Sequence, residues 1–303
     1  MKLAANPSIA AAANEVRADL RAAIGRLEEC DVPSAPLAAE LLLMHVLQRD
    51  RTWLYAHPEF ELNPKDAAAY AQLIERRSEG VPTQYLTGRQ EFWGLEFEVG
   101  PGVLIPRPET EHVIEVALER LGARRTEPSR IADVGTGSGC IAISLARELP
   151  CAEIVATDIS AAALDYAQRN AARHSVSNRI QFLNADLLEA AIAAPSSAQS
   201  GFDLIVSNPP YVGRSDAASL PREVREHEPA EALFAGDDGL QIYPALIEQA
   251  ARKLAPNGIL VLELGYNGAQ YVGSLLSAPH WSDLRFTRDL AGIERVISAR
   301  LSA

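Results

Sequence analysis

Hydrophobic residues recur at helical spacing in the first quarter of the chain. The three series are Val16, Leu20, Ile24 and Leu27, then Leu37, Leu41, Met44 and Leu47, and finally Tyr70, Leu73 and Ile74. Spacings of three and four residues place such side chains on one face of an α-helix, where they can pack together. The pattern predicts a small helical domain over residues 1–82.

The pattern then changes to an alternation of apolar and polar residues. In "QEFWGLEFEVGPGVLIPRPETE" the alternation runs around Gly94 and again around Gly100 to Gly102. A period of two that is interrupted by glycine is typical of paired strands. We therefore expect residues 83–107 to form a β-hairpin linker.

From Arg130 onward, short apolar segments with the character of strands alternate with helical segments. The expected strands are "RIADVG", "AEIVATD", "RIQFLNAD", "FDLIVSN" and "ILVLELG", and helices are expected from about Cys140, from about Ala161, and from about Leu240 to Leu254. This alternation predicts right-handed βαβ units, and hence an α/β fold with a parallel sheet covered on both faces. "LRFTRDL" and "ERVISARL" can pair as a terminal antiparallel hairpin, a pairing that sequence alone leaves open. "APSSAQSG", residues 194–201, predicts a surface loop.

Composition restricts the possible partners of the protein. The chain has 303 residues and a formal net charge of -12, with no run of Lys and Arg longer than a pair. Such a balance repels nucleic-acid phosphates, so we expect no direct nucleic-acid partner. The three cysteines lack CxxC spacing and the six histidines lack paired metal spacing, so we expect no metal site.

The same features bear on the cellular compartment. Three scattered cysteines fit a reducing environment, and the N-terminal "MKLAANPSIAAAANEVRADL" is a poor signal peptide because polar residues break its apolar run. No segment approaches the roughly 20 apolar residues that a membrane helix needs. We expect a cytoplasmic protein with no membrane partner.

A glycine-rich turn and two acidic residues are candidates for ligand binding. "DVGTGSGC" places Gly135, Gly137 and Gly139 between a strand and a helix, where the backbone can approach a ligand closely. Asp158 ends the next strand and can accept hydrogen bonds from ribose hydroxyls, and Asp186 follows the third strand. Taken singly, each acid is more typical of a helix cap or a solvated loop. Because all of them fall at one sheet edge, they favour a nucleoside ligand without a pyrophosphate.

The segment "LIVSNPPYVG" ends a buried strand with an unusual polar turn. The prolines fix the backbone and remove two N–H donors, so the Asn208 side chain and the Pro209 carbonyl can present a rigid pair of acceptors. Tyr211 adds a flat apolar face. A planar NH2 group, either a carboxamide or an adenine amino group, fits this arrangement. Accepting both of its hydrogens holds the nitrogen in line with a methyl donor and favours the positive charge that grows during attack.

These motifs are similar to those of a known family. The chain resembles the class I S-adenosylmethionine-dependent methyltransferases with an Asn-Pro-Pro-Tyr motif, and among them the release factor glutamine methyltransferases. The resemblance covers nearly the whole chain and rests on "YLTGRQEFWG", "LIPRPETE", "DVGTGSG", "SNPPYV", "EHEPAEALFAGDDGL" and "AGIERV". It implies a Rossmann-like seven-stranded mixed sheet over residues 108–303, joined by the β-hairpin to a helical domain for substrate recognition.

The resemblance also implies a role for individual residues. The cofactor S-adenosyl-L-methionine, which leaves as S-adenosyl-L-homocysteine, would be bound by Gly135, Thr136, Gly137, Ser138, Gly139, Asp158, Asp186, Leu187 and Asn208, with Phe92 and Arg107 near the cofactor cleft. The glutamine of the Gly-Gly-Gln motif in class I peptide chain release factors would be received by Asn208, Pro209, Pro210 and Tyr211, of which Asn208, Pro209 and Tyr211 would be catalytic.

Three other functions stay open from the sequence. A sister branch of the family methylates a glutamine of a ribosomal protein and shares "SNPPYV" and "AGDDGL", although "LIPRPETE" and "EFWG" favour the release factor branch. An adenine-N6 nucleic-acid methyltransferase would use the same acceptor pair, and a non-catalytic cofactor-binding module would need no acceptor pair. The charged segment Arg222 to Glu231 follows the Asn-Pro-Pro-Tyr turn, where it is either a solvated face or a lid over the substrate.

Overall fold

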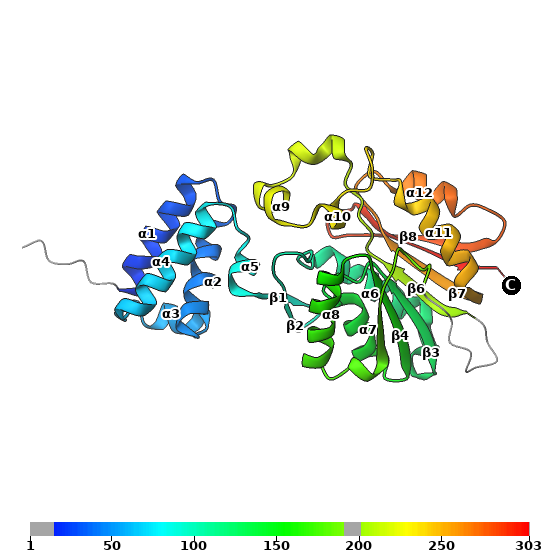
Figure 1. Ribbon diagram of the computed structural model, residues 1–303, viewed down its shortest axis with the longest axis horizontal. Coiled ribbons are helices and arrows are strands. Elements are labelled where there is room, and N and C mark those ends of the chain that lie inside the picture. Colours follow the sequence, from blue (N-terminus) through cyan, green and yellow to red (C-terminus); the bar gives the residue numbers. More distant parts are fainter. Residues whose placement is uncertain (1–14, 191–200, 303) are drawn as a thin grey trace, which may run out of the picture. The chain divides into compact units, whose positions relative to one another are not determined.

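The computed structural model describes residues 15–190 and 201–302, which divide after Thr87 into two compact units (Figure 1). Residues 1–14 and most of the loop predicted at 194–201 lie outside the described residues. Within them, no helix is long and apolar enough to cross a membrane.

The first unit is helical, as its periodicity predicts. Its helices are α1 (Val16–Glu29), α2 (Ala35–Leu47), α3 (Arg51–Ala56), α4 (Pro64–Ser78) and α5 (Thr83–Thr87). Asn63 fixes the start of α4, because its side chain accepts a hydrogen bond from the backbone N–H of Asp66 and Pro64 occupies the first helical position. The core of this unit includes the fully buried Leu27 and Leu42.

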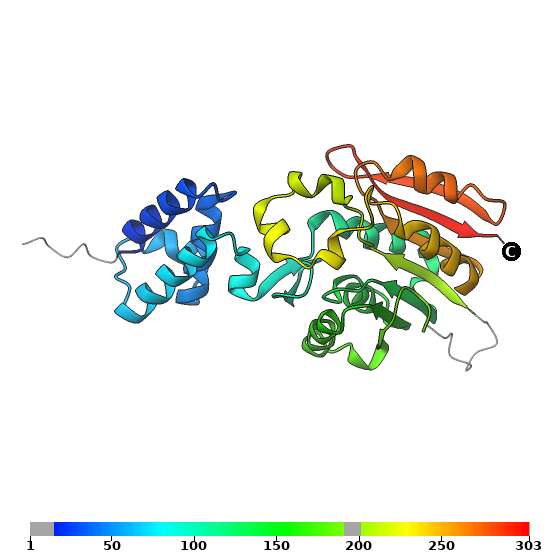
Figure 2. The ribbon, with the colours of Figure 1, turned by 45° about the horizontal axis from the view of Figure 1, so that its top comes forward.

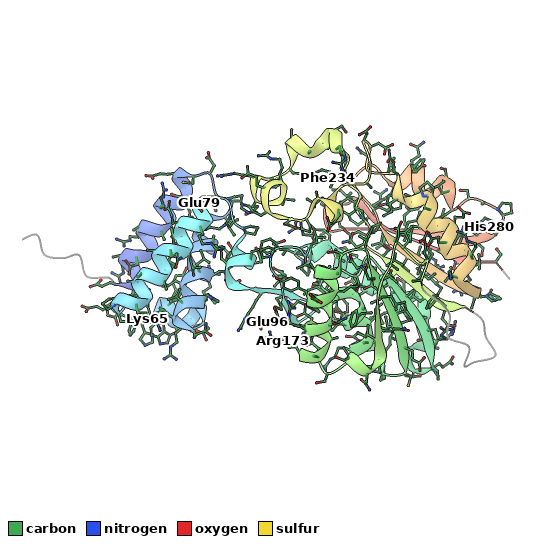
Figure 3. All side chains as sticks on the ribbon, viewed as in Figure 1. Lys65, Glu79, Glu96, Arg173, Phe234 and His280 are labelled. Carbon is green, nitrogen blue, oxygen red and sulfur yellow. The ribbon has the colours of Figure 1, made fainter. Side chains whose placement is uncertain are left out.

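A β-hairpin opens the second unit. Strands β1 (Arg89–Phe92) and β2 (Leu95–Glu98) pair antiparallel around Trp93 and Gly94, both of which have positive φ, as a two-residue turn requires. Asn170 anchors the hairpin to helix α8 (Ala161–Arg173), since its side chain bonds both the N–H and the C=O of Glu98. Glu96 and Arg173 add an exposed ion pair (Figure 3). The chain around Gly100 to Gly102 forms no strand.

A mixed sheet forms the centre of the second unit (Figure 2). In the described residues it has seven strands in the order β5 (Ile180–Asn184), β4 (Ala152–Asp158), β3 (Ser129–Val134), β6 (Phe202–Ser207), β7 (Leu254–Glu263), β9 (Glu294–Leu301) and β8 (Trp281–Arg288). The first five run parallel, and β9 is antiparallel to both of its neighbours. The predicted α/β fold is therefore confirmed, and the pairing of the last two strands, which the sequence left open, is antiparallel.

Helices cover both faces of the sheet, because alternate strand residues point to opposite sides. Ile131 and Leu204 pack beneath α6 (Glu111–Leu121), α7 (Cys140–Glu148) and the end of α8. Ala132 and Ile205 face α11 (Ile242–Lys253) and α12 (Ala269–Leu275) on the other side. The remaining short helices are α9 (Arg222–His227), α10 (Ala230–Leu233) and the 3-10 turns η1 (Pro108–Thr110), η2 (Gly122–Thr126), η3 (Ser177–Arg179) and η4 (Arg214–Ser219).

Candidate active site

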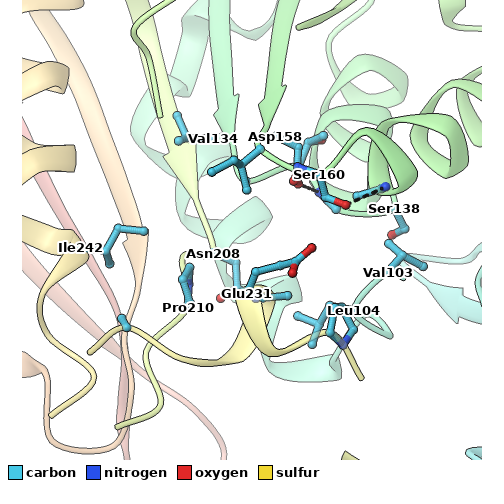
Figure 4. Close-up of a pocket in the computed structure, with 18 of the residues that line it drawn as sticks. Val103, Leu104, Val134, Ser138, Asp158, Ser160, Asn208, Pro210, Glu231 and Ile242 are labelled. Atoms are coloured by element: carbon cyan, nitrogen blue, oxygen red, sulfur yellow. Dashed lines mark hydrogen bonds between the residues drawn. The ribbon is translucent and has the colours of Figure 1, made fainter. Parts of the chain in front are cut away.

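A cavity of about 460 Å³ lies at the carboxyl ends of the parallel strands (Figure 4). Open α/β sheets bind ligands at this edge. Its walls are the turns that follow β3, β4, β5 and β6, together with parts of residues 102–110 and 229–242. All of its lining residues belong to the second unit.

The glycine turn is held from beneath by a buried carboxyl group. Asp133 Oδ2 accepts hydrogen bonds from Thr136 Oγ1 at 2.6 Å and from the backbone N–H of Ala142 at 3.1 Å. Burial raises the pKa of Asp133 to about 7, although both hydrogen bonds act in the opposite direction. Asp133 does not line the cavity, so it supports the turn and does not contact a ligand.

Asp158 lies where the sequence places it, at the end of β4 and in the wall of the cavity. Its Oδ2 accepts a hydrogen bond from Gly137 N–H and its Oδ1 one from Ser160 N–H, both at 2.8 Å. Each carboxylate oxygen keeps a second lone pair for a ligand hydroxyl. Burial is the main cause of a raised Asp158 pKa, and the nearby Glu231 carboxylate raises it further.

Asp186 and Leu187 also line the cavity, after β5. Leu187 has a φ of 48°, in the left-handed region that bulky residues rarely enter. Such strain collects at ligand-binding sites, where surrounding structure holds it in place. The sequence indicates Leu187 by its place beside Asp186 after the third strand, whereas its backbone strain leaves no sequence signal.

The Asn-Pro-Pro-Tyr turn contributes two of its four residues to the cavity wall. Asn208 and Pro210 line the cavity, whereas Pro209 is buried beside them and Tyr211 lies behind them. Asn208 Nδ2 donates a hydrogen bond to Thr110 Oγ1 at 3.0 Å, and the Tyr211 hydroxyl donates one to Glu263 Oε1 at 3.1 Å.

The segment "LFAGDDG" supports the turn from the other side. Val212 N–H donates to Leu233 C=O at 2.9 Å, and the N–H of Ala235 donates back to Val212 C=O at 3.0 Å. At Gly239, which has a φ of 80°, an added Cβ would lie 2.3 Å from the carbonyl oxygen of Tyr211. This close approach explains why the segment needs glycine.

The charged segment after the turn has two different parts. Arg222 and Glu226 form an exposed ion pair along α9, as a solvated face would. Glu231, on α10, points into the cavity opposite Asp158 (Figure 4). Only the second part of Arg222 to Glu231 therefore reaches the site.

Phe92 and Arg107 do not line the cavity. Phe92 is 1% exposed and packs edge-to-face on Phe97 in the core, because its position in β1 directs the ring inward. Arg107 Nη2 donates to the buried Glu228 Oε1 at 2.6 Å and so holds residues 105–107 against the segment before α10. Neither side chain forms part of the cavity wall, although Arg107 directly follows Pro106, which does. Gly139 likewise lies behind it, where a Cβ would meet Ile143 at 2.9 Å.

Sequence reasoning missed several residues of the cavity wall. The missed residues include Val103, Leu104, Pro106, Thr110, Ser160, Phe234, Gln241 and Ile242. Most are apolar, and apolar residues carry no chemical signal of their own. Several fall within or beside "LIPRPETE" and "EHEPAEALFAGDDGL", the motifs that also carry the family resemblance.

The cavity wall is acidic. Its charged side chains, within the residues that the structure describes, are Asp158, Asp186 and Glu231, with no Lys, Arg or His among them. Carboxylates attract cationic ligands and repel phosphate groups. The cavity therefore suits a nucleoside that carries positive charge, and it disfavours a dinucleotide or a nucleoside phosphate.

Comparisons with known proteins find similar chains. The family model of the PrmC N-terminal domain matches residues 20–88, and that of the methyltransferase small domain matches residues 113–224. A release factor glutamine methyltransferase of Koribacter versatilis is 45% identical over 92% of this chain and 95% of its own length. A protein of the same name from Chlorobaculum tepidum is 43% identical, with 92% and 95% covered.

A solved structure shares the fold. It is a T. thermophilus 16S rRNA N2 G1207 methyltransferase in complex with AdoMet and guanosine, with 21% identity and a TM-score of 0.50. The match covers 70% of this chain and 49% of that one.

Proposed function

Because the chain belongs to the release factor glutamine methyltransferase family, we propose that it methylates class I peptide chain release factors. The acceptor is the side-chain amide nitrogen, N5, of the glutamine in their Gly-Gly-Gln motif. The methyl donor is S-adenosyl-L-methionine, which leaves as S-adenosyl-L-homocysteine. The single observation that carries the proposal is the position of Asn208 in the wall of an acidic cavity that suits a cationic nucleoside.

The residues around the cavity fit the proposed cofactor. When bound, S-adenosyl-L-methionine supplies a methyl group that its positively charged sulfur makes electrophilic. The acidic wall favours its sulfonium and ammonium charges. The methionine portion would be held by residues 135–138, the ribose by Asp158, and the adenine by Asp186 and Leu187.

The chain's own part in the reaction is to orient a weak nucleophile. An amide nitrogen attacks poorly, because its lone pair is delocalised into the carbonyl group. The Asn208 Oδ1 atom and the Pro209 carbonyl accept its two hydrogens, which fixes the direction of attack and stabilises the positive charge that develops on nitrogen. Pro210 and Tyr211 keep this pair of acceptors in place. No strong base is needed before the attack, because the proton leaves afterwards.

The two units have separate roles in this proposal. The second unit performs the chemistry, and the helical domain over residues 1–82 recognises the body of the release factor, with residues 83–107 as the linker. We place the protein in the cytoplasm and in translation termination, since release factors act there.

Mass spectrometry tests the proposal directly. The protein is incubated with S-adenosyl-L-methionine and a release factor, and the Gly-Gly-Gln peptide should gain the mass of one methyl group on its glutamine. An Asn208→Ala variant should lose this transfer and still bind S-adenosyl-L-homocysteine in calorimetry. Labelled methyl groups on a ribosomal protein or on nucleic acid, with none on the release factor, would contradict the proposal.

A further inference from the structure

The side chain of Asn208 can face the cavity in two ways, and only one of them suits the proposed reaction. With Oδ1 toward the cavity it accepts a hydrogen from a carboxamide NH2. With Nδ2 toward the cavity it donates, and it then repels an NH2 group and attracts a carboxylate. Something in the structure must therefore select between the two orientations.

The hydrogen bond between Asn208 and Thr110 makes this selection. Asn208 Nδ2 donates to Thr110 Oγ1 at 3.0 Å, which leaves Oδ1 for the cavity. Thr110 is 1% exposed, so water does not compete with this bond. Thr110 immediately precedes α6, where a threonine hydroxyl commonly caps the helix, yet its side chain makes no capping bond.

The surroundings of Thr110 decide which way its own proton points. Its hydroxyl faces the carboxyl group of Glu263, which is 1% exposed. Tyr211 already donates to Glu263 Oε1, while the buried Oε2 has no hydrogen-bond partner in residues 15–190 and 201–302. A proton donated by Thr110 thus has a buried acceptor at Glu263.

A reversed Asn208 would disturb this arrangement. Its Oδ1 would then face Thr110 and would need the only proton that the Thr110 hydroxyl carries. The Thr110 proton would then no longer be available to Glu263, whose buried Oε2 has no other donor within the described residues, and an unpaired buried carboxyl oxygen is costly. The observed orientation uses Thr110 Oγ1 as an acceptor for Asn208 and leaves the Thr110 proton available to Glu263.

We propose that Thr110 is a positioning residue, which fixes the Asn208 amide with Oδ1 toward the cavity and so makes the site select glutamine over glutamate. The inference rests on the proposed function and names the origin of its specificity. The inference also assigns a role to the motif "LIPRPETE". This motif contains Thr110, which lies beside Asn208 only in the folded chain.

Two substitutions separate the hydroxyl group from the shape of the side chain. Thr110→Val keeps the shape and removes the hydroxyl, whereas Thr110→Ser keeps the hydroxyl. We expect Thr110→Val to lower kcat/KM for release factor methylation by about tenfold or more, while the affinity for S-adenosyl-L-homocysteine in calorimetry stays unchanged. Thr110→Ser should stay near the activity of the unaltered protein. If Thr110→Val fails to fold, as judged by circular dichroism, Thr110→Ala takes its place with the same expectation.

A second measurement responds to the orientation of the Asn208 amide and not to a general loss of structure. A release factor whose Gly-Gly-Gln glutamine is replaced by glutamate serves as a competitive inhibitor. Thr110→Val should bind this inhibitor more tightly relative to the normal substrate, because a freed Asn208 can turn its NH2 group to the carboxylate. Equal loss of affinity for both proteins would indicate a merely structural role and overturn the inference.

The outcomes also distinguish the inference from the proposed function. If the unaltered protein methylates the release factor and Thr110→Val behaves like it in both assays, only the inference fails. If the unaltered protein leaves the release factor unmethylated, the proposed function fails and the inference falls with it.

Discussion

Single residues at the sheet edge carry the proposed chemistry. Asn208 directly follows β6, whose residues are mostly buried and apolar, and it brings an amide to the cavity wall. Asp158 ends β4, which β3 separates from β6, and its carboxylate both fixes the glycine turn and keeps lone pairs for a ligand. These positions follow from strand direction, because parallel strands end together at one edge.

Replacing Asp158 tests the proposed ribose contact. Asp158→Ala should weaken the binding of S-adenosyl-L-homocysteine by about 10- to 100-fold in calorimetry, because hydrogen bonds to a charged acceptor are lost. Asp165→Ala, on the exposed surface of α8, is the matched control and should leave affinity unchanged. Equal affinity of Asp158→Ala and the unaltered protein would remove Asp158 from the site.

The buried carboxyl group of Asp133 predicts a dependence of stability on pH. Its pKa is raised to about 7 in the folded protein, against about 4 in an unfolded chain. Between these values the folded state binds more protons, so this group's contribution to stability falls as pH rises, by at most about 1.4 kcal/mol per pH unit. Above about pH 7 the contribution becomes constant.

Urea denaturation of Asp133→Asn checks this prediction. The amide does not titrate, so the stability advantage of the unaltered protein over the variant should shrink steadily from about pH 4 to about pH 7. A difference in unfolding free energy that is independent of pH over this window would show that Asp133 titrates normally in the folded state.

A place in the cavity wall could be predicted from the sequence where a residue follows the end of a strand, and less well for residues elsewhere. Asn208, Asp158 and Asp186 reach the cavity as predicted. Phe92 and Arg107 do not line it, because the family resemblance assigns a role to a position in the sequence and does not predict where the side chain points. Thr110 was missed since its hydroxyl acquires a function only when residues far apart in sequence meet.

At the scale of elements, hydrophobic periodicity identified the sheet and most of the long helices, but not α6 (Glu111–Leu121). The helix predicted from about Leu240 to Leu254 is Ile242–Lys253, and those predicted from Cys140 and Ala161 begin at these residues. Short elements such as α3, α5, α9 and α10 were not predicted, because one or two turns contain too few residues to show a period. Their positions depend on tertiary contacts.

The Asn-Pro-Pro-Tyr turn depends on the segment that packs behind it, and Gly239 tests this dependence. Gly239→Ala places a Cβ 2.3 Å from the Tyr211 carbonyl oxygen. We expect a loss of at least about 1 kcal/mol in unfolding free energy from the positive φ alone. A fall in kcat of about tenfold or more should accompany it, as the turn is displaced.

Gly292→Ala is a control that separates the effect of backbone strain from the effect of a steric clash with the turn. Gly292 has the same φ of 80°, but an added Cβ would meet nothing within 4 Å. This control should lose stability and keep its methylation rate per folded molecule. If both variants keep the rate, the packing behind the turn does not govern the site.

At the scale of the whole molecule, we expect the second unit to bind the cofactor without contacts from the helical unit. Every residue of the cavity wall comes from residues 102–242 of the second unit. The net charge of -12 disfavours nucleic acid, and the acidic cavity wall favours a cationic cofactor. The net charge of the whole chain therefore acts against nucleic-acid partners, while the local charge of the cavity wall favours cationic ligands.

Hydrogen exchange tests this separation. Added S-adenosyl-L-homocysteine stabilises the structure that binds it, so amides in the turns after β3, β4, β5 and β6 should exchange more slowly. Amides of residues 15–87 should exchange at unchanged rates. Protection that is strongest in the helical unit would place the cofactor elsewhere.

The central claim is that Asn208 and Pro209 together accept the two hydrogens of a glutamine carboxamide. A crystal structure of the protein with a Gly-Gly-Gln peptide and S-adenosyl-L-homocysteine measures this contact most directly. The glutamine nitrogen should lie about 3 Å from both Asn208 Oδ1 and the Pro209 carbonyl oxygen. A carboxamide bound elsewhere, or an Asn208 that offers its NH2 group to the peptide, would contradict the account.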